Sequence, residues 1–212
     1  MTVTATGPTK TYGTALTAGT STTNFTSSGV ISGQAVTSVT LTPDAAGLSA
    51  TTAAGAAYVV TTSLATGTGG FLESNYTVTY VPYNGTVGKK ALTVTATGPT
   101  KTYGTALTAG TSTTNFTSSG EVTGQAVTGV TLTPDAAGLS ATTAAGAAYV
   151  VTPSLATGTG GFLESNYTVT YVPYNGTVGK KALTVTATGP TKTYGTALTA
   201  GTSTTNFTSI IC

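Results

Sequence analysis

The stretch Tyr76-Thr77-Val78-Thr79-Tyr80 alternates large apolar side chains with hydroxyl side chains. Successive side chains of a β-strand point to opposite faces, so the two tyrosines and Val78 would share one face and the threonines the other. Threonine and valine are also β-branched, and β-branched residues favour an extended backbone. The stretch therefore predicts a strand with one face against a core.

Three further stretches predict strands: residues 39–42 and 92–97 alternate in the same way, and residues 57–64 are rich in Val and Thr. The dipeptide Asn84-Gly85 follows the first strand-like stretch and is a strong hairpin signal, so we expect a turn there that joins residues 76–81 to residues 86–95. Residues 50–57 are the only helix-compatible stretch, and their Thr and Gly disfavour a helix. Short strands separated by turn signals predict an all-β sandwich or barrel.

Charged residues are few: seven Lys, two Asp and three Glu among 212 residues, with no Arg, no His and no Trp. Without His or Arg, most general acid–base and phosphate-binding chemistry has no obvious agent, so we do not expect an enzyme. A net charge of +2 provides no basic surface for nucleic acid. A single Cys excludes an internal disulfide framework, and no apolar run reaches the roughly 20 residues of a membrane span.

The chain is a tandem array of near-identical units. The string TVTATGPTKTYGTALTAGTSTTNFTS begins at Thr2, again at Thr93 and again at Thr184, with a spacing of 91 residues. Residues 2–92 and 93–183 differ at five pairs of positions, which are Val30/Glu121, Ile31/Val122, Ser32/Thr123, Ser38/Gly129 and Thr62/Pro153. A unit of this length suits a small domain with its own core. We therefore expect domains at 1–92 and 93–183 and a partial third repeat at 184–212, with physical boundaries near residues 98 and 189 as an alternative.

The motifs LTVTA at 92–96, KTYG at 101–104 and NYTVTYVP at 75–82 resemble the MBG domain of YGX type, an Ig-like repeat of large bacterial surface proteins and adhesins. The resemblance covers both full units. It implies tandem Ig-like β-sandwiches that act as a stalk or spacer at the bacterial cell surface. Separately, the sequence shows no phosphate-binding loop or metal cluster, so we expect no cofactor. One departure is that Thr105 and Ala106 follow the Tyr-Gly pair, where family members often carry acidic residues.

Two roles remain open at this point. In the first, short Gly-Pro linkers stiffen the array into an extracellular rod or filament. In the second, the repeats are adhesin modules that bind a surface glycan or host surface through loops. Phe71 and Tyr83 could be contact residues in such loops, although packing in a core or a turn is the simpler assumption for each. Both roles place the protein outside the cell.

The partial third repeat is too short to bury a core of its own. We therefore expect it to complete its fold with a neighbouring copy, by supplying strands to an incomplete sandwich or by adding to a sheet edge. Repeated from copy to copy, such a contact gives a head-to-tail homopolymer. The alternative is that the chain is one window of a longer array. The candidate segment for strand complementation comprises Thr184, Val185, Thr186, Ala187, Thr188, Tyr194 and Phe207.

Covalent and metal-dependent devices are the remaining candidates. Asn24, Asn75, Asn115 and Asn166 each precede an aromatic residue and Thr and match the glycosylation acceptor, although a chain with 57 Thr produces such matches by composition. Lys10, Lys89 and Lys90 could form an isopeptide bond assisted by Glu73, or could be ordinary surface lysines. Calcium prefers several carboxylates close together, and Asp44 and Glu73 are far apart in sequence, so we expect no metal site.

Overall fold

The computed structural model describes residues 1–211 and consists mostly of β-sheet, as the alternating pattern predicts. Its contacts divide the chain into two compact units, which are described separately. The first unit contains Met1–Val94, Thr117–Val130 and Leu155–Tyr171. The second contains Thr95–Phe116, Thr131–Ser154 and the chain from Val172 onward. The domain boundaries at residues 92 and 183 remain predictions.

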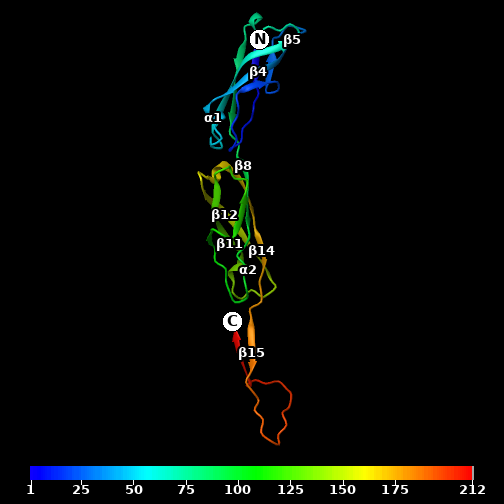
Figure 1. Ribbon diagram of the computed structural model, residues 1–212, viewed down its shortest axis with the longest axis vertical. Helices are drawn as coiled ribbons and strands as arrows, with labels where there is room; N and C mark the ends of the chain where they lie inside the picture. Colours follow the sequence, from blue (N-terminus) through cyan, green and yellow to red (C-terminus); the bar gives the residue numbers. More distant parts are fainter. Residues whose placement is uncertain (212) are drawn as a thin grey trace. The chain divides into compact units, whose positions relative to one another are not determined.

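The first sequence copy lies within the first unit and forms two sheets. In one sheet, β1 (Thr2–Ala5) pairs antiparallel with β3 (Phe25–Ser28) and parallel with β6 (Thr79–Val81). The other sheet has the order β2-β4-β5-β7, and all its neighbours are antiparallel. Figure 1 shows its two long strands, β4 and β5, side by side. The bounds are Gly19–Ser21 for β2, Ala35–Pro43 for β4, Ala57–Thr68 for β5 and Tyr83–Thr86 for β7.

The core of this copy lies between the two sheets, where β1 and β6 contact β5. Side chains buried there come from alternate positions, as a two-layer fold requires. They include Val3 of β1, Leu41 of β4, and Tyr58 and Val60 of β5. Thr61, Thr66 and Thr68 of β5 are exposed, whereas Thr62 follows Val60 at the next core-facing position and is buried.

A single helical turn, α1 (Ala45–Leu48), connects β4 to β5. Asp44 is its N-cap: one carboxylate oxygen accepts from the Gly47 N–H at 2.7 Å, and the other accepts from the Val59 N–H at 3.0 Å. The same side chain therefore caps the turn and ties it to β5. The sequence did not predict this helix, because four residues show no helical periodicity.

The second sequence copy repeats these local arrangements. One sheet has β8 (Lys90–Ala96) between β10 and β13, and the other has the order β14-β12-β11-β9. The short helix α2 (Ala136–Leu139) has Asp135 as its N-cap. Each copy also has a 3-10 turn, η1 (Glu73–Asn75) or η2 (Glu164–Asn166). The other bounds are Gly110–Ser112 for β9, Phe116–Ser119 for β10, Ala126–Pro134 for β11, Ala148–Thr159 for β12, Tyr167–Val172 for β13 and Tyr174–Thr177 for β14.

The start of the third copy forms a separate antiparallel pair in the second unit. Strand β15 (Leu183–Ala187) pairs with β16 (Phe207–Ile211), drawn in orange and red in Figure 1. Val185 of β15 is 59% exposed, whereas Val94, its counterpart in β8, is fully buried. The apolar positions that face a core in the first two copies are therefore open to solvent in the third.

The hairpin predicted at Asn84-Gly85 is wrong. Both residues lie inside β7, where Gly85 pairs with Tyr58 of β5. A Cβ added to Gly85 would lie 2.3 Å from the Tyr58 ring carbon Cζ. The glycine therefore makes room for a core tyrosine and does not form a turn.

The other strand predictions are confirmed with adjustments. Residues 39–42, 57–64 and 92–97 fall almost entirely within β4, β5 and β8. The 76–80 stretch keeps its predicted alternation, with exposed threonines between half-buried Tyr76, Val78 and Tyr80, but only its end is a strand in the first copy. Phe71 and Tyr83 are not free loop contacts, because Phe71 is buried and Tyr83 lies in β7.

Candidate functional site

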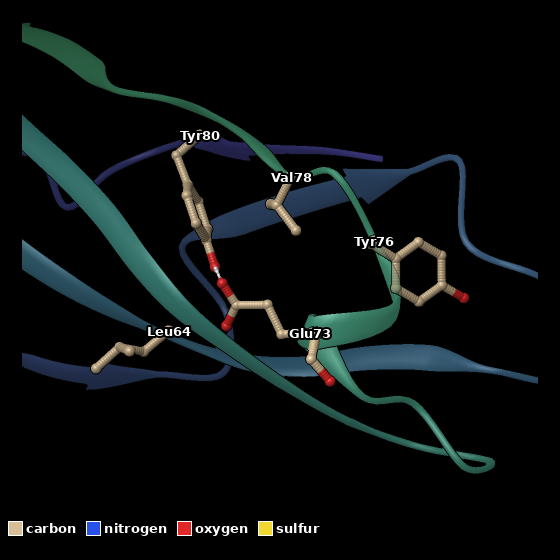
Figure 2. A pocket seen from close by; sticks show the side chains of 6 residues that line it. Leu64, Glu73, Tyr76, Val78 and Tyr80 are labelled. Carbon is tan, nitrogen blue, oxygen red and sulfur yellow. Dashed lines mark hydrogen bonds between the residues drawn. The ribbon is translucent and has the colours of Figure 1, made fainter.

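An open pocket lies on the first copy beside η1, lined by Leu64, Glu73, Ser74, Tyr76, Val78 and Tyr80. Figure 2 shows the Tyr80 hydroxyl directed at the Glu73 carboxylate, to which it donates a 2.8 Å hydrogen bond. The same hydroxyl accepts from the Ala65 N–H at 2.9 Å. Burial raises the pKa of Tyr80, and the bond to Glu73 raises it further against the opposing effect of the Ala65 N–H. The phenol is thereby held as a proton donor to the carboxylate.

Leu64 borders this pocket with an unusual backbone. Its φ is +51°, in the left-handed region, and its side chain is 65% exposed. The register between β4 and β5 shifts at this point, so the bulged strand turns the leucine outward and directs the Ala65 N–H to Tyr80. Leu155 has the same φ and exposure in the second copy.

The equivalent pocket of the second copy has a lysine in its lining where the first pocket has a leucine. Its lining is Lys89, Glu164, Ser165, Tyr167, Val169 and Tyr171, so a lysine from the end of the first copy joins the glutamate and tyrosines of the second. All six residues belong to the first compact unit. The pocket volume is about 390 Å³, compared with about 530 Å³ in the first copy. The pocket is thus one border of the surface at which the two copies meet.

Tyr12 is the centre of that surface and is only 3% exposed. Its ring meets the ring of Tyr167 edge-on, with centroids 5.5 Å apart and planes at 79°. Gln125 joins the two phenols, because its Nε2 donates to the Tyr12 hydroxyl at 2.6 Å and its Oε1 accepts from the Tyr167 hydroxyl. Tyr12, Gln125 and Tyr167 all lie in the first compact unit.

Two further contacts complete the surface. The Ala54 N–H donates to the Asn166 side-chain oxygen at 3.0 Å, and Asn166 is 4% exposed. Gly13 packs against Val122 so closely that a Cβ on Gly13 would lie 2.5 Å from a Val122 methyl. We call this set the repeat junction: Tyr12, Gly13 and Ala54 from the first copy, with Val122, Gln125, Asn166 and Tyr167 from the second.

Lys10, next to the junction in sequence, is buried instead of solvated. Its ammonium donates to the carbonyl oxygens of Gly47 and Ser49 at the end of α1. Burial lowers the pKa of Lys10, and the nearby Asp44 carboxylate opposes that effect. Lys101 binds the equivalent carbonyls beside α2, whereas Lys192 of the third copy is exposed. The lysine of the Lys-Thr-Tyr-Gly motif therefore fixes the chain that leads into Tyr12.

The segment predicted for strand complementation is exposed throughout. Thr184, Val185, Thr186 and Ala187 pair with the β16 strand, in which Phe207 faces Ala187, and the Thr188 N–H donates to the Asn206 carbonyl. Tyr194 is fully exposed and Phe207 is 41% exposed. Complementation by a second copy remains a prediction.

The four glycosylation candidates differ in accessibility. Asn75 is exposed, and Asn24 and Asn115 are half-buried. Asn166 is buried in the repeat junction, where a glycan would break its contact with Ala54. Glycans at the four positions remain a prediction.

The junction residues were missed from sequence alone, although one signal pointed to them. Three of the five differences between the copies fall at positions 30–32 and 121–123, and Val122 lies in the junction. Within the described residues, no cluster of three or more His, Cys, Asp or Glu could hold a metal. No helix in that part of the chain has the length and apolarity to span a membrane.

Comparisons with protein-family models, with curated proteins and with solved structures found no match to this chain. The resemblance to the MBG domain therefore rests on its short motifs alone.

Proposed function

We propose that this chain is a structural stalk or spacer made of tandem Ig-like repeats, carried by a bacterial extracellular surface protein or filament. The observation that supports this role is the repeat junction, in which Tyr12 of one copy is enclosed by Gln125 and Tyr167 of the next. A contact between consecutive copies limits how far one copy can move relative to the next. A spacer requires such a restraint if it is to hold its ends apart. The low charge, 12 charged residues in 212, offers little electrostatic repulsion between adjacent repeats.

Replacing Tyr12 with Ala tests the junction. We expect faster hydrogen exchange at the Ala54 amide, because the bond to Asn166 depends on the two copies remaining together. Tyr103→Ala is the matched control, since Tyr103 has the same sequence neighbours but is 44% exposed. The measurement is residue-resolved hydrogen exchange in dilute protein. Equal exchange at Ala54 in both variants contradicts a restraining junction.

Electron microscopy of the native material tests the role itself. A stalk or filament is expected to give extended particles whose length grows with the number of repeats. Compact particles would contradict the proposal.

A second role, an adhesin module that binds a glycan or host surface, is favoured by the open pocket of the first copy. An exposed Leu64 in a left-handed conformation beside Glu73 and Tyr80 is a ready contact surface. The test is binding of the monomeric chain to a glycan array. Binding that is lost in the Leu64→Ser variant would support this role, and no binding to any glycan of the array would favour the stalk.

A further inference from the structure

Identical residues have different exposure in the two copies, and the repeat junction is the cause. Tyr12 is 3% exposed and Tyr103 is 44% exposed, although both occur in the sequence Lys-Thr-Tyr-Gly-Thr-Ala. Asn166 and Tyr167 are buried, whereas Asn75 is exposed and Tyr76 is half-buried. Each full copy therefore carries both halves of the junction. In these two copies, the receiving half of the first and the inserting half of the second are not covered; Tyr194 of the partial third copy is exposed as well.

We propose that these uncovered halves bind each other between two molecules, so that a second copy of this chain is the partner. The receiving face comprises Ile31, Gln34, Asn75 and Tyr76. The inserting face comprises Tyr103, Gly104 and Ala145. The inference deepens the proposed structural role by naming the surfaces through which separate chains join.

The receiving face is already arranged as it is in the junction. The Tyr76 hydroxyl donates to Gln34 Oε1 at 2.6 Å, as the Tyr167 hydroxyl does to Gln125. The Ile31 N–H donates to the Tyr76 hydroxyl at 3.2 Å, as the Val122 N–H does to Tyr167. Because Gln34 and Tyr76 are already held by these bonds, binding costs little further side-chain entropy, which favours association.

The inserting face has the matching shape. The Tyr103 N–H donates to the Gly179 carbonyl and the Gly104 N–H to the Ala141 carbonyl, which repeats the backbone anchoring of Tyr12 and Gly13. Gly104 has a φ of +89° and no side chain, so Ile31, which is 64% exposed, can approach it as Val122 approaches Gly13. Ala145 is exposed and is the counterpart of Ala54, whose N–H binds Asn166.

Charge complementarity points the same way. In the covered pocket, Lys89 lies with Glu164, and the uncovered pocket of the first copy offers Glu73 without a lysine in its lining. Lys180 is the counterpart of Lys89 and is exposed. Docking of the two faces would bring Lys180 of one molecule to Glu73 of the other.

The contact joins two different surfaces, so it does not close on itself and can propagate. Sedimentation equilibrium of the full chain tests it up to about 1 mM, the order of the effective concentration that a short linker gives neighbouring repeats. We expect the average mass to rise with concentration. Asn75→Ala and Tyr103→Ala should each weaken association by at least about tenfold, because Tyr103 and Asn75 are the anchors of the two faces.

A mixture of the two variants gives a sharper outcome. The Asn75→Ala chain keeps an intact inserting face, and the Tyr103→Ala chain keeps an intact receiving face. The mixture should therefore form one-to-one dimers and nothing larger, whereas each variant alone should associate at least about tenfold more weakly than the unaltered chain. A chain that does not associate, or variants that associate as the unaltered chain does, would overturn the proposal.

Val185→Asp separates this contact from strand complementation. The substitution places a charge on β15, outside both faces, so association through the faces should be unchanged. Loss of association in Val185→Asp, with retention in Tyr103→Ala, would assign assembly to the third-copy strands and overturn the proposal. The Tyr12→Ala exchange experiment is made on dilute protein, so its outcome for the stalk does not depend on this result.

Discussion

At the scale of single residues, Thr62 carries an unpaired buried hydroxyl that the second copy lacks. Its hydroxyl is buried and has no hydrogen-bond partner within the part of the chain that the structure describes. The second copy has Pro153 at this position, fully buried and without a hydroxyl. A buried hydroxyl without a partner costs about 1–3 kcal/mol, so the two copies should differ in stability at this point.

Replacing Thr62 with Val should therefore stabilise the chain by about 1 kcal/mol, because valine has the same shape and no unpaired hydroxyl. The measurement is the free energy of unfolding in urea. Thr61→Val is the matched control, since that hydroxyl is exposed and donates to the Thr42 carbonyl at 3.1 Å. A Thr62→Val chain no more stable than the Thr61→Val chain contradicts the assignment.

The burial of Lys10 and Tyr12 could not be predicted from the identity of these residues. Lysine is almost never fully buried without partners, so sequence reasoning places Lys10 in solvent. The carbonyls that hold it lie about forty residues away, on a one-turn helix that no periodicity reveals. Tyr12 is buried by residues of the next copy, and Tyr103, in the same local sequence, is not. No rule based on local sequence could separate those two tyrosines.

At the scale of strands, sequence patterns predicted the positions of several strands, whereas the Asn-Gly turn signal predicted a hairpin that does not form. The period-two stretches correctly located β4 and β8, and the Val- and Thr-rich stretch located β5, because one face of each packs on a core. The hairpin predicted from the Asn-Gly pair is wrong because Gly85 is needed where the Tyr58 ring of the neighbouring strand packs against it, and not for a local turn. Cross-strand packing of this kind depends on register, which the local sequence does not contain.

Gly85→Ala tests this explanation. The added Cβ would lie 2.3 Å from Tyr58 Cζ, so we expect a loss of about 1–3 kcal/mol in the free energy of unfolding from overpacking. Gly19→Ala in β2 is the matched control, because nothing lies within 4 Å of the Cβ it would add. Equal stability of the two variants would show that Gly85 is not required by Tyr58. Gly176 and Tyr149 repeat the contact in the second copy and should respond alike.

At the scale of the whole molecule, five tyrosines have a pKa that burial raises. Burial raises the pKa of Tyr58, Tyr80, Tyr149, Tyr167 and Tyr171, the last to about 12. In the unfolded chain a tyrosine ionises near its ordinary value of 10.0. Above that pH the unfolded state binds fewer protons than the folded state, so raising the pH favours unfolding.

The buried tyrosines should therefore make their full contribution to stability below about pH 10, and this contribution should be lost progressively as the pH rises through about 12. Lys10 acts in the opposite direction, because its lowered pKa makes stability rise with pH just below 10.5, but it is one group against five. Tyr171→Phe should reduce the difference in unfolding free energy between about pH 9 and about pH 11.5, even though it also removes the bonds to Glu164 and Ala156. Tyr194→Phe removes a fully exposed phenol and is the matched control. An equal alkaline loss in both variants would mean that the buried phenols do not control it.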